Sequence, residues 1–122
     1  MTEYNEISVF NGIYLEDSYV LGLEIGLAQT VVRMLFVLNE FHPDYCDPLP
    51  GEQYCYSDGR IVFSGYSEVR LRKIDAVPSI DADGEEDFGN IYYLRETGNL
   101  FEVAGDWGEM SIKDGNVGVV FN

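Results

Sequence analysis

The densest group of oxygen ligands in the sequence is the acidic segment SIDADGEEDFGN, Ser79 to Asn90. Its five carboxylates belong to Asp81, Asp83, Glu85, Glu86 and Asp87. An EF-hand loop takes calcium ligands from positions 1, 3, 5, 7, 9 and 12 and has Gly at position 6. Gly84 fits position 6, but Ser79 and Asn90 replace the first Asp and the last Glu. We predict no tight metal site, and two interpretations stay open: a solvated loop between strands, or a docking surface for a basic protein.

A second group that could do chemistry consists of His42, Cys46 and Cys55. The spacing H-x3-C-x8-C is not one of the usual zinc patterns, and an Asp would have to supply the fourth ligand. We therefore predict neither a zinc site nor a Cys–His catalytic pair. In a reducing cytoplasm both thiols stay free and act as small apolar groups, whereas in an exported protein they could bridge one loop.

Signatures of catalysis are missing from the sequence. It contains no H-E-x-x-H, no P-loop and no C-x-x-C, and GYSEV, Gly65 to Val69, lacks the last Gly of a nucleophile elbow. With 22 acids in the chain, no particular carboxylate pair stands out for glycoside hydrolysis. We expect a protein without catalytic residues or a cofactor, and a minor hydrolase stays as an alternative.

Aromatic residues supply the other candidate binding groups. Tyr45, Tyr54 and Tyr56 lie in a long connection, residues 42–60, that carries Pro and Gly and is expected to pack against the domain. Trp107, the only Trp, stands between two glycines in GDWGEMSI. It is interpreted either as a cap on the core or as an exposed anchor in an interface. We name these four aromatics, together with the five acids above, as partner-binding candidates.

The charge of the chain excludes several classes of partner. There are 22 acids and 7 bases, a net charge of −15, divided into −8 for residues 1–61 and −7 for residues 62–122. Such a field repels nucleic acid and anionic membranes, and it attracts basic proteins. The only basic cluster is Arg70, Arg72 and Lys73, which we expect to neutralise acids on neighbouring strands or, as a minor alternative, to bind a small anion. The N-terminus has no signal-peptide pattern, so we expect a cytoplasmic protein.

Short apolar segments separated by turn residues indicate an all-β domain. We expect a single domain over residues 1–122, an antiparallel sandwich or barrel of about eight to nine strands. The first strand is predicted at Glu6–Phe10, and the clearest one runs from Ser18 to Leu27, where apolar residues alternate with Val20, Gly22, Glu24 and Gly26. The second face of that strand is nearly bare, so another group is expected to pack closely there.

Two late hairpins and one ambiguous segment complete this prediction. Thr97-Gly98 and Gly115-Asn116 each stand between two extended segments and are typical of tight hairpins. The segment from Thr30 to Phe41 carries a helical stripe as well as many β-branched residues. We predict a central strand, with an α+β fold and a helix near 27–40 as the alternative.

Three segments of the sequence together resemble small, uncharacterised bacterial β-proteins: PGEQYCY at 50–56, DADGEEDFGNI at 81–91 and GDWGEM at 105–110. In size, acidity and lack of a catalytic motif the chain is also similar to bacterial toxin-immunity proteins. The first resemblance implies no particular activity, whereas the second implies a non-enzymatic binding protein, an inhibitor of a basic protein partner. Neither transfers a functional residue. The rival expectation is a β-domain that binds a small ligand or a carbohydrate beneath the Tyr-rich loop 41–60.

Overall fold

The computed structural model describes residues 1–73, 79–80 and 86–122. Two short 3-10 helices, η1 (Tyr4–Glu6) and η2 (Ser8–Phe10), are its helical elements within those ranges. The strands are β1 (Thr2–Glu3), β2 (Ile13–Ile25), β3 (Gln29–Leu38), β4 (Cys55–Ser64), β5 (Glu68–Lys73), β6 (Ser79–Ile80), β7 (Glu86–Asp87), β8 (Ile91–Thr97), β9 (Leu100–Gly105), β10 (Gly108–Lys113) and β11 (Asn116–Phe121). No helix of this described part is long and apolar enough to cross a bilayer.

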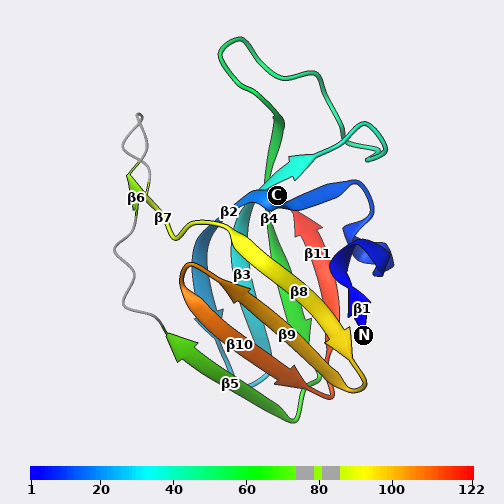
Figure 1. Cartoon of the computed structure of the whole chain (residues 1–122), viewed down its shortest axis with the longest axis vertical. Coiled ribbons are helices and arrows are strands. Elements are labelled where there is room, and N and C mark those ends of the chain that lie inside the picture. Colours follow the sequence, from blue (N-terminus) through cyan, green and yellow to red (C-terminus); the bar gives the residue numbers. More distant parts are fainter. Residues whose placement is uncertain (74–78, 81–85) are drawn as a thin grey trace.

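The described strands form an antiparallel β-sandwich. One sheet has five strands in the order β1-β8-β9-β10-β5, and the other has four in the order β11-β4-β3-β2. Figure 1 shows the two sheets facing each other, with the small β6-β7 pair to one side. The all-β prediction is confirmed, and the sandwich alternative is correct because the strands form two separate sheets. Since β3 occupies Gln29–Leu38, the helix near 27–40 is wrong.

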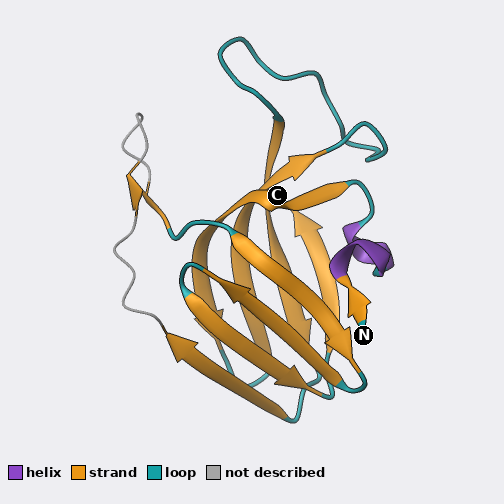
Figure 2. Ribbon diagram, in the orientation of Figure 1, coloured by secondary structure: helices purple, strands orange, loops and turns teal. Residues whose placement is uncertain are grey.

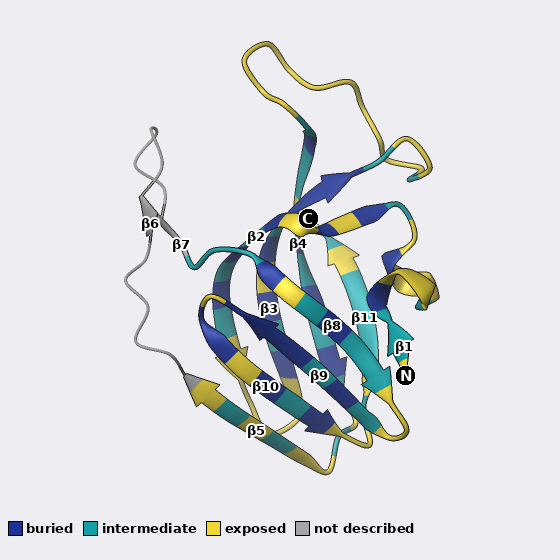
Figure 3. Cartoon of the chain, in the orientation of Figure 1, coloured by how far each residue is buried: buried dark blue, intermediate teal, exposed yellow. Residues whose placement is uncertain are grey.

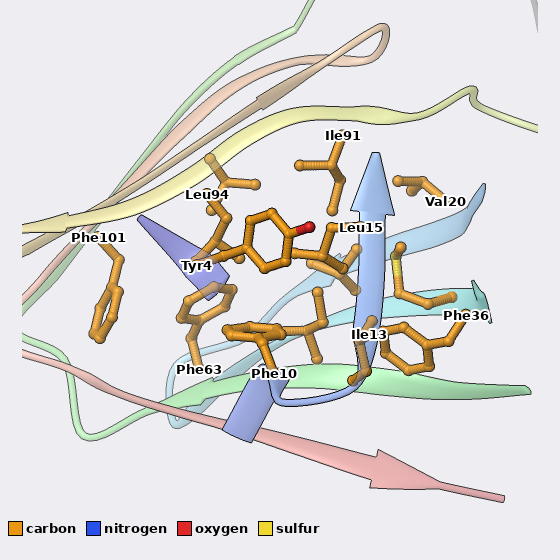
Figure 4. Close-up of a cluster of buried hydrophobic side chains, with 14 of the residues drawn as sticks. Tyr4, Phe10, Ile13, Leu15, Val20, Phe36, Phe63, Ile91, Leu94 and Phe101 are labelled. Atoms are coloured by element: carbon orange, nitrogen blue, oxygen red, sulfur yellow. The ribbon is translucent and has the colours of Figure 1, made fainter. Parts of the chain in front are cut away.

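The core lies between the sheets and is built from both of them. Buried stretches lie in strands of both sheets (Figure 3). Phe36 and Phe63 of the four-stranded sheet and Leu94 and Ile112 of the five-stranded sheet are fully buried. Phe63 and Phe101 face each other across the layers, with ring centroids 5.7 Å apart (Figure 4). Burying about ten side chains of this size is the main source of stability in such a fold.

The N-terminal strand predicted at Glu6–Phe10 is wrong, because η1 and η2 occupy this segment. Tyr4, Ile7 and Phe10 recur every third residue, which is the period of a 3-10 helix. The rings of Tyr4 and Phe10 pack edge to face at 6.0 Å, and Ile7 packs against the same core. A strand would point Tyr4 and Ile7 to opposite faces, so the turns bury more apolar surface.

Strand β2 contains two irregularities that change which of its residues face the core. Its register against β3 shifts between Tyr14 and Tyr19 and again between Val20 and Gly22. The predicted alternation therefore fails locally: Val20 is buried, whereas the alternation predicts it on the bare face. The bare face at Gly22 does have a close neighbour, as predicted, because the guanidinium of Arg33 lies where a Cβ of residue 22 would be.

The predicted hairpin at Thr97-Gly98 is confirmed by the pairing of β8 with β9. The hairpin predicted at Gly115-Asn116 is wrong. Both edges of β10 are already occupied, by β9 and by β5, so β11 cannot pair there. The chain instead crosses to the other sheet, where β11 pairs with β4.

Candidate functional site

An open pocket of about 260 Å³ lies where β3 ends and β4 begins in the four-stranded sheet, beneath the loop of residues 39–54 that joins these two strands. In Figure 2 this loop is the longest teal segment, and it projects beyond the ends of the strands. Most of it is exposed (Figure 3), so the expectation that the connection packs closely on the domain is wrong for its tip. The connection is also shorter than predicted, since β4 begins at Cys55.

The start of the loop is held firmly against the sandwich. The Asn39 amide donates to the carbonyl of Gly12 over 2.8 Å, and the His42 ring packs on Phe121 with ring centroids 5.0 Å apart. Gly12 has a φ of +80° and lies so close to the His42 backbone that a side chain would collide with it. The loop is therefore anchored at the end of β3 and extends outward from there.

Aromatic side chains form the wall of the pocket: Tyr14, Phe41, Tyr45 and Tyr54 line it. Val37 forms part of its floor and is paired across the sheet with Tyr14 on one side and Tyr56 on the other. Val37 is fully buried although it lies outside the core cluster, so aromatic groups cover the outer face of the sheet at this point. The polar lining comes from Asn39, Glu40 and Gln53.

The three predicted tyrosines lie in one region. Tyr45 and Tyr54 line the pocket, and Tyr56 stands behind Tyr54 with ring centroids 6.1 Å apart in an edge-to-face arrangement. Burial raises the pKa of the Tyr56 hydroxyl, and nearby Tyr19, Tyr54, Glu52 and Asp17 raise it further. The surface beside the pocket is therefore both aromatic and electronegative.

Trp107 is not part of this surface. Only 7% of the residue is exposed, and it belongs to the core cluster between the sheets. The interpretation of Trp107 as a cap on the core agrees with this burial. Its role as an exposed anchor does not, and we leave Trp107 out of the candidate site.

The five acids of the 79–90 segment cannot be placed as a site. Asp81, Asp83 and Glu85 lie outside the described residues, and for Glu86 and Asp87 only the backbone is described. Glu86 pairs with Ile80 and Asp87 with Ser79 in the β6-β7 pair. The docking role of these acids stays a prediction.

The three candidate metal ligands do not converge. The Cys46 and Cys55 sulfur atoms lie 3.0 Å apart, but the His42 ring packs on Phe121, and its Nδ1 accepts a hydrogen bond from the Asp44 amide. Within the described residues there is no group of three His, Cys, Asp or Glu side chains that could hold an ion.

A second depression, of about 310 Å³, lies on the five-stranded sheet near Arg70 and Arg72. Arg70 forms an ion pair with Glu68 on the same strand at 3.0 Å, and Arg72 stands opposite Glu109 on β10. Glu102 also lines the depression. The expected neutralisation by acids of neighbouring strands is not seen at Arg70, whose acidic partner lies on its own strand and which stands opposite Ser111, and at Arg72 it rests on the register with Glu109 alone. Two arginines and two acids line the depression, so its lining has no excess of either charge.

Sequence reasoning did not name Tyr14, Phe41 and Val37 as parts of the site. Tyr14 is far from the loop in sequence and meets it only through the β2-β3 pairing. Phe41 lies three residues beyond the end of β3 and is 83% exposed, and the sequence pattern does not reveal that exposure. Comparisons of the chain with protein-family models, curated proteins and solved structures found no match.

Proposed function

We propose that this chain is a non-enzymatic binding protein that captures a basic protein partner, as an inhibitor of the immunity type would. The observation that supports this proposal most is the aromatic pocket beneath the 39–54 loop, within a strongly acidic stretch of chain. Residues 39–58 contain five acids and no Lys or Arg. A cationic side chain of the partner fits both properties of this surface.

The size of the pocket favours a side chain over a larger ligand. Sites for drug-sized molecules usually enclose about 300–1,000 Å³, whereas this pocket has about 260 Å³ and is open to solvent. One Arg or Lys side chain, delivered by a protein surface, can enter such a space. Aromatic faces attract a cation with about 0.5–1 kcal/mol at exposed sites. Glu40 in the lining can pair with the same group.

The overall negative charge of the chain affects how fast a basic partner associates with it. A net charge of −15 attracts a basic protein over distance and raises its association rate, more strongly at low salt. Asp81, Asp83, Glu85, Glu86 and Asp87 are proposed to steer the partner in this way. Tyr45, Tyr54 and Tyr56, with Phe41, are proposed to hold it once it is bound.

A second candidate function is the binding of a small neutral ligand such as a carbohydrate. The observation that favours it is the pairing of aromatic rings with two amide side chains, Asn39 and Gln53, in the pocket lining. Rings can stack on a sugar while amides fix its hydroxyl groups. Such binding would not depend on the charge of the protein and would change little with salt.

A titration followed by NMR amide shifts tests the proposal. The probes are the peptide acetyl-Gly-Ser-Arg-Ser-Gly-amide, its citrulline analogue without the positive charge, and a neutral trisaccharide. We expect the arginine peptide to shift amides of residues 37–41, 45 and 53–56, the citrulline analogue to bind more weakly, and salt to weaken the arginine complex. Shifts spread evenly over the acidic surface would contradict the pocket. Salt-independent binding of the trisaccharide there would support the second candidate instead.

A further inference from the structure

Two thiols from separate segments of the chain meet beside the pocket. The sulfur atoms of Cys46 and Cys55 lie 3.0 Å apart, and the Cys46 amide donates a hydrogen bond to the Cys55 sulfur over 3.2 Å. A disulfide bond has a sulfur–sulfur distance of about 2.05 Å. The two groups therefore need to approach by only about 1 Å to form one.

The two residues differ in how firmly they are held. Cys55 is 3% exposed, belongs to the core cluster and pairs with Leu38 at the start of β4. Cys46 is exposed and lies among exposed residues of the loop. Its thiol is open to a reagent from solvent, and the loop can supply the small movement that bond formation requires.

We propose that Cys46 and Cys55 are a disulfide-forming pair whose oxidation fastens the 39–54 loop to β4. The oxidant is a low-molecular-weight disulfide such as glutathione disulfide. The Cys46 thiolate attacks one of its sulfur atoms and releases the first small thiol, which leaves a mixed disulfide on Cys46. The Cys55 sulfur then attacks the Cys46 sulfur, forms the internal bond and releases the second small thiol. Two protein thiols are oxidised, one small disulfide is reduced, and the two protons end on the released thiols.

Because this bond forms next to two residues that line the pocket, the redox state of the two cysteines affects the shape of the pocket. Tyr45 directly precedes Cys46, and Tyr54 directly precedes Cys55. Both tyrosines line the pocket, so the bond fixes two of its aromatic walls relative to each other. The disulfide itself does not depend on the proposed function, and its test needs no binding partner.

The test compares reduced protein with protein equilibrated in excess glutathione disulfide, using mass spectrometry of unreduced digests and amide hydrogen exchange. We expect an internal link between the peptides that contain Cys46 and Cys55 in most chains. We also expect exchange of the hydrogen-bonded loop amides of Tyr45, Cys46 and Glu52 to slow by about tenfold, because the link removes loop openings. The Cys46→Ser variant should show neither change, and Cys55→Ala, which keeps a small apolar group in the core, should show glutathione attached stably to Cys46.

Three outcomes would overturn the proposal. Wild-type chains could keep glutathione on Cys46 without passing to the internal bond. They could form links between two chains in place of the internal link. The internal link could also form while the exchange of the Tyr45, Cys46 and Glu52 amides stays unchanged, which would contradict the fastening of the loop.

Discussion

Gly22 and Arg33 face each other across the β2-β3 pairing, and the Arg33 side chain lies over the glycine and donates a hydrogen bond to the carbonyl of Leu21 over 3.2 Å. A methyl group at residue 22 would displace the guanidinium. In the Arg33→Ala background, Gly22→Ala should raise the free energy of unfolding by about 0.5–1 kcal/mol, because a glycine within a strand loses more entropy on folding. When Arg33 is present, Gly22→Ala should raise the free energy of unfolding less, or not at all. Urea unfolding of the four proteins measures this coupling, and equal effects in both backgrounds would show that Arg33 does not occupy the space.

The Ser18 side chain stabilises the first irregularity of β2, the register shift between Tyr14 and Tyr19. Its hydroxyl donates to the Tyr14 carbonyl over 2.6 Å and accepts from the Val37 amide over 2.9 Å, and the residue is fully buried. Ser18→Ala leaves both backbone groups without this partner and should lower the free energy of unfolding by about 1–3 kcal/mol. The exposed Ser8→Ala is the control and should change it by no more than about 0.5 kcal/mol. If the two variants are equally stable in urea, the hydroxyl is not needed by the bulge.

Asp114 connects three turns at one end of the sandwich. Hydrogen bonds to its carboxylate from Asn99 and Ser67 lower its pKa. A carboxyl whose folded pKa lies below its unfolded value, about 3.9 for Asp, stabilises the fold above that value and loses this effect as the pH falls through the folded pKa. Asp114→Asn tolerates the positive φ of 62° but lacks the carboxylate.

The melting temperature of Asp114→Asn should therefore lie below that of the wild type at pH 7, and the gap should narrow at pH 3. Asp44→Asn, on the exposed loop, is the control for the loss of one surface charge. A gap that stays constant between the two pH values would argue against a role for the Asp114 carboxylate.

Formation of the Cys46–Cys55 disulfide should depend on pH. The hydrogen bond with Cys55 is the main cause that raises the pKa of the Cys46 thiol above its ordinary value, and the negative charges of Cys55, Asp47 and Glu52 nearby raise it further. Only the thiolate attacks a disulfide, so the reaction with glutathione disulfide should be slow at pH 7 and should still be accelerating at pH 9. The rate can be followed by quenching samples with acid. A rate that levels off between pH 7 and pH 8 would indicate a more acidic thiol.

The sequence was sufficient to predict the fold class because its dominant signals are local. Alternating apolar residues and the turn at Thr97-Gly98 specify strands and a hairpin without reference to the rest of the chain. The predictions that are wrong concern segments whose partner strand lies far away in the sequence. The segment after Lys113 looks like a hairpin, yet β10 has no free edge and β11 must cross to β4.

The candidate site was predictable only in part for the same reason. Tyr45, Tyr54 and Tyr56 are close in sequence and were found together. Tyr14 joins them through a register that depends on two irregularities in β2, which composition does not reveal. For Trp107 the sequence leaves the core cap and the exposed anchor open, because its flanking glycines indicate a turn but not whether the indole points inward.

The central claim is that a cationic group binds in the pocket beneath the 39–54 loop, and one pair of variants tests it most directly. Phe41 lines the pocket and is 83% exposed, whereas Leu27 is fully exposed in the β2-β3 turn and does not line it. Neither truncation should disturb the core. The measurement is the affinity of each variant for the arginine peptide by NMR titration at one salt concentration. Phe41→Ala should weaken binding by about two- to fivefold, the value of one exposed cation–aromatic contact, and Leu27→Ala should leave it unchanged. Equal affinities of the two variants and the wild type would contradict the claim.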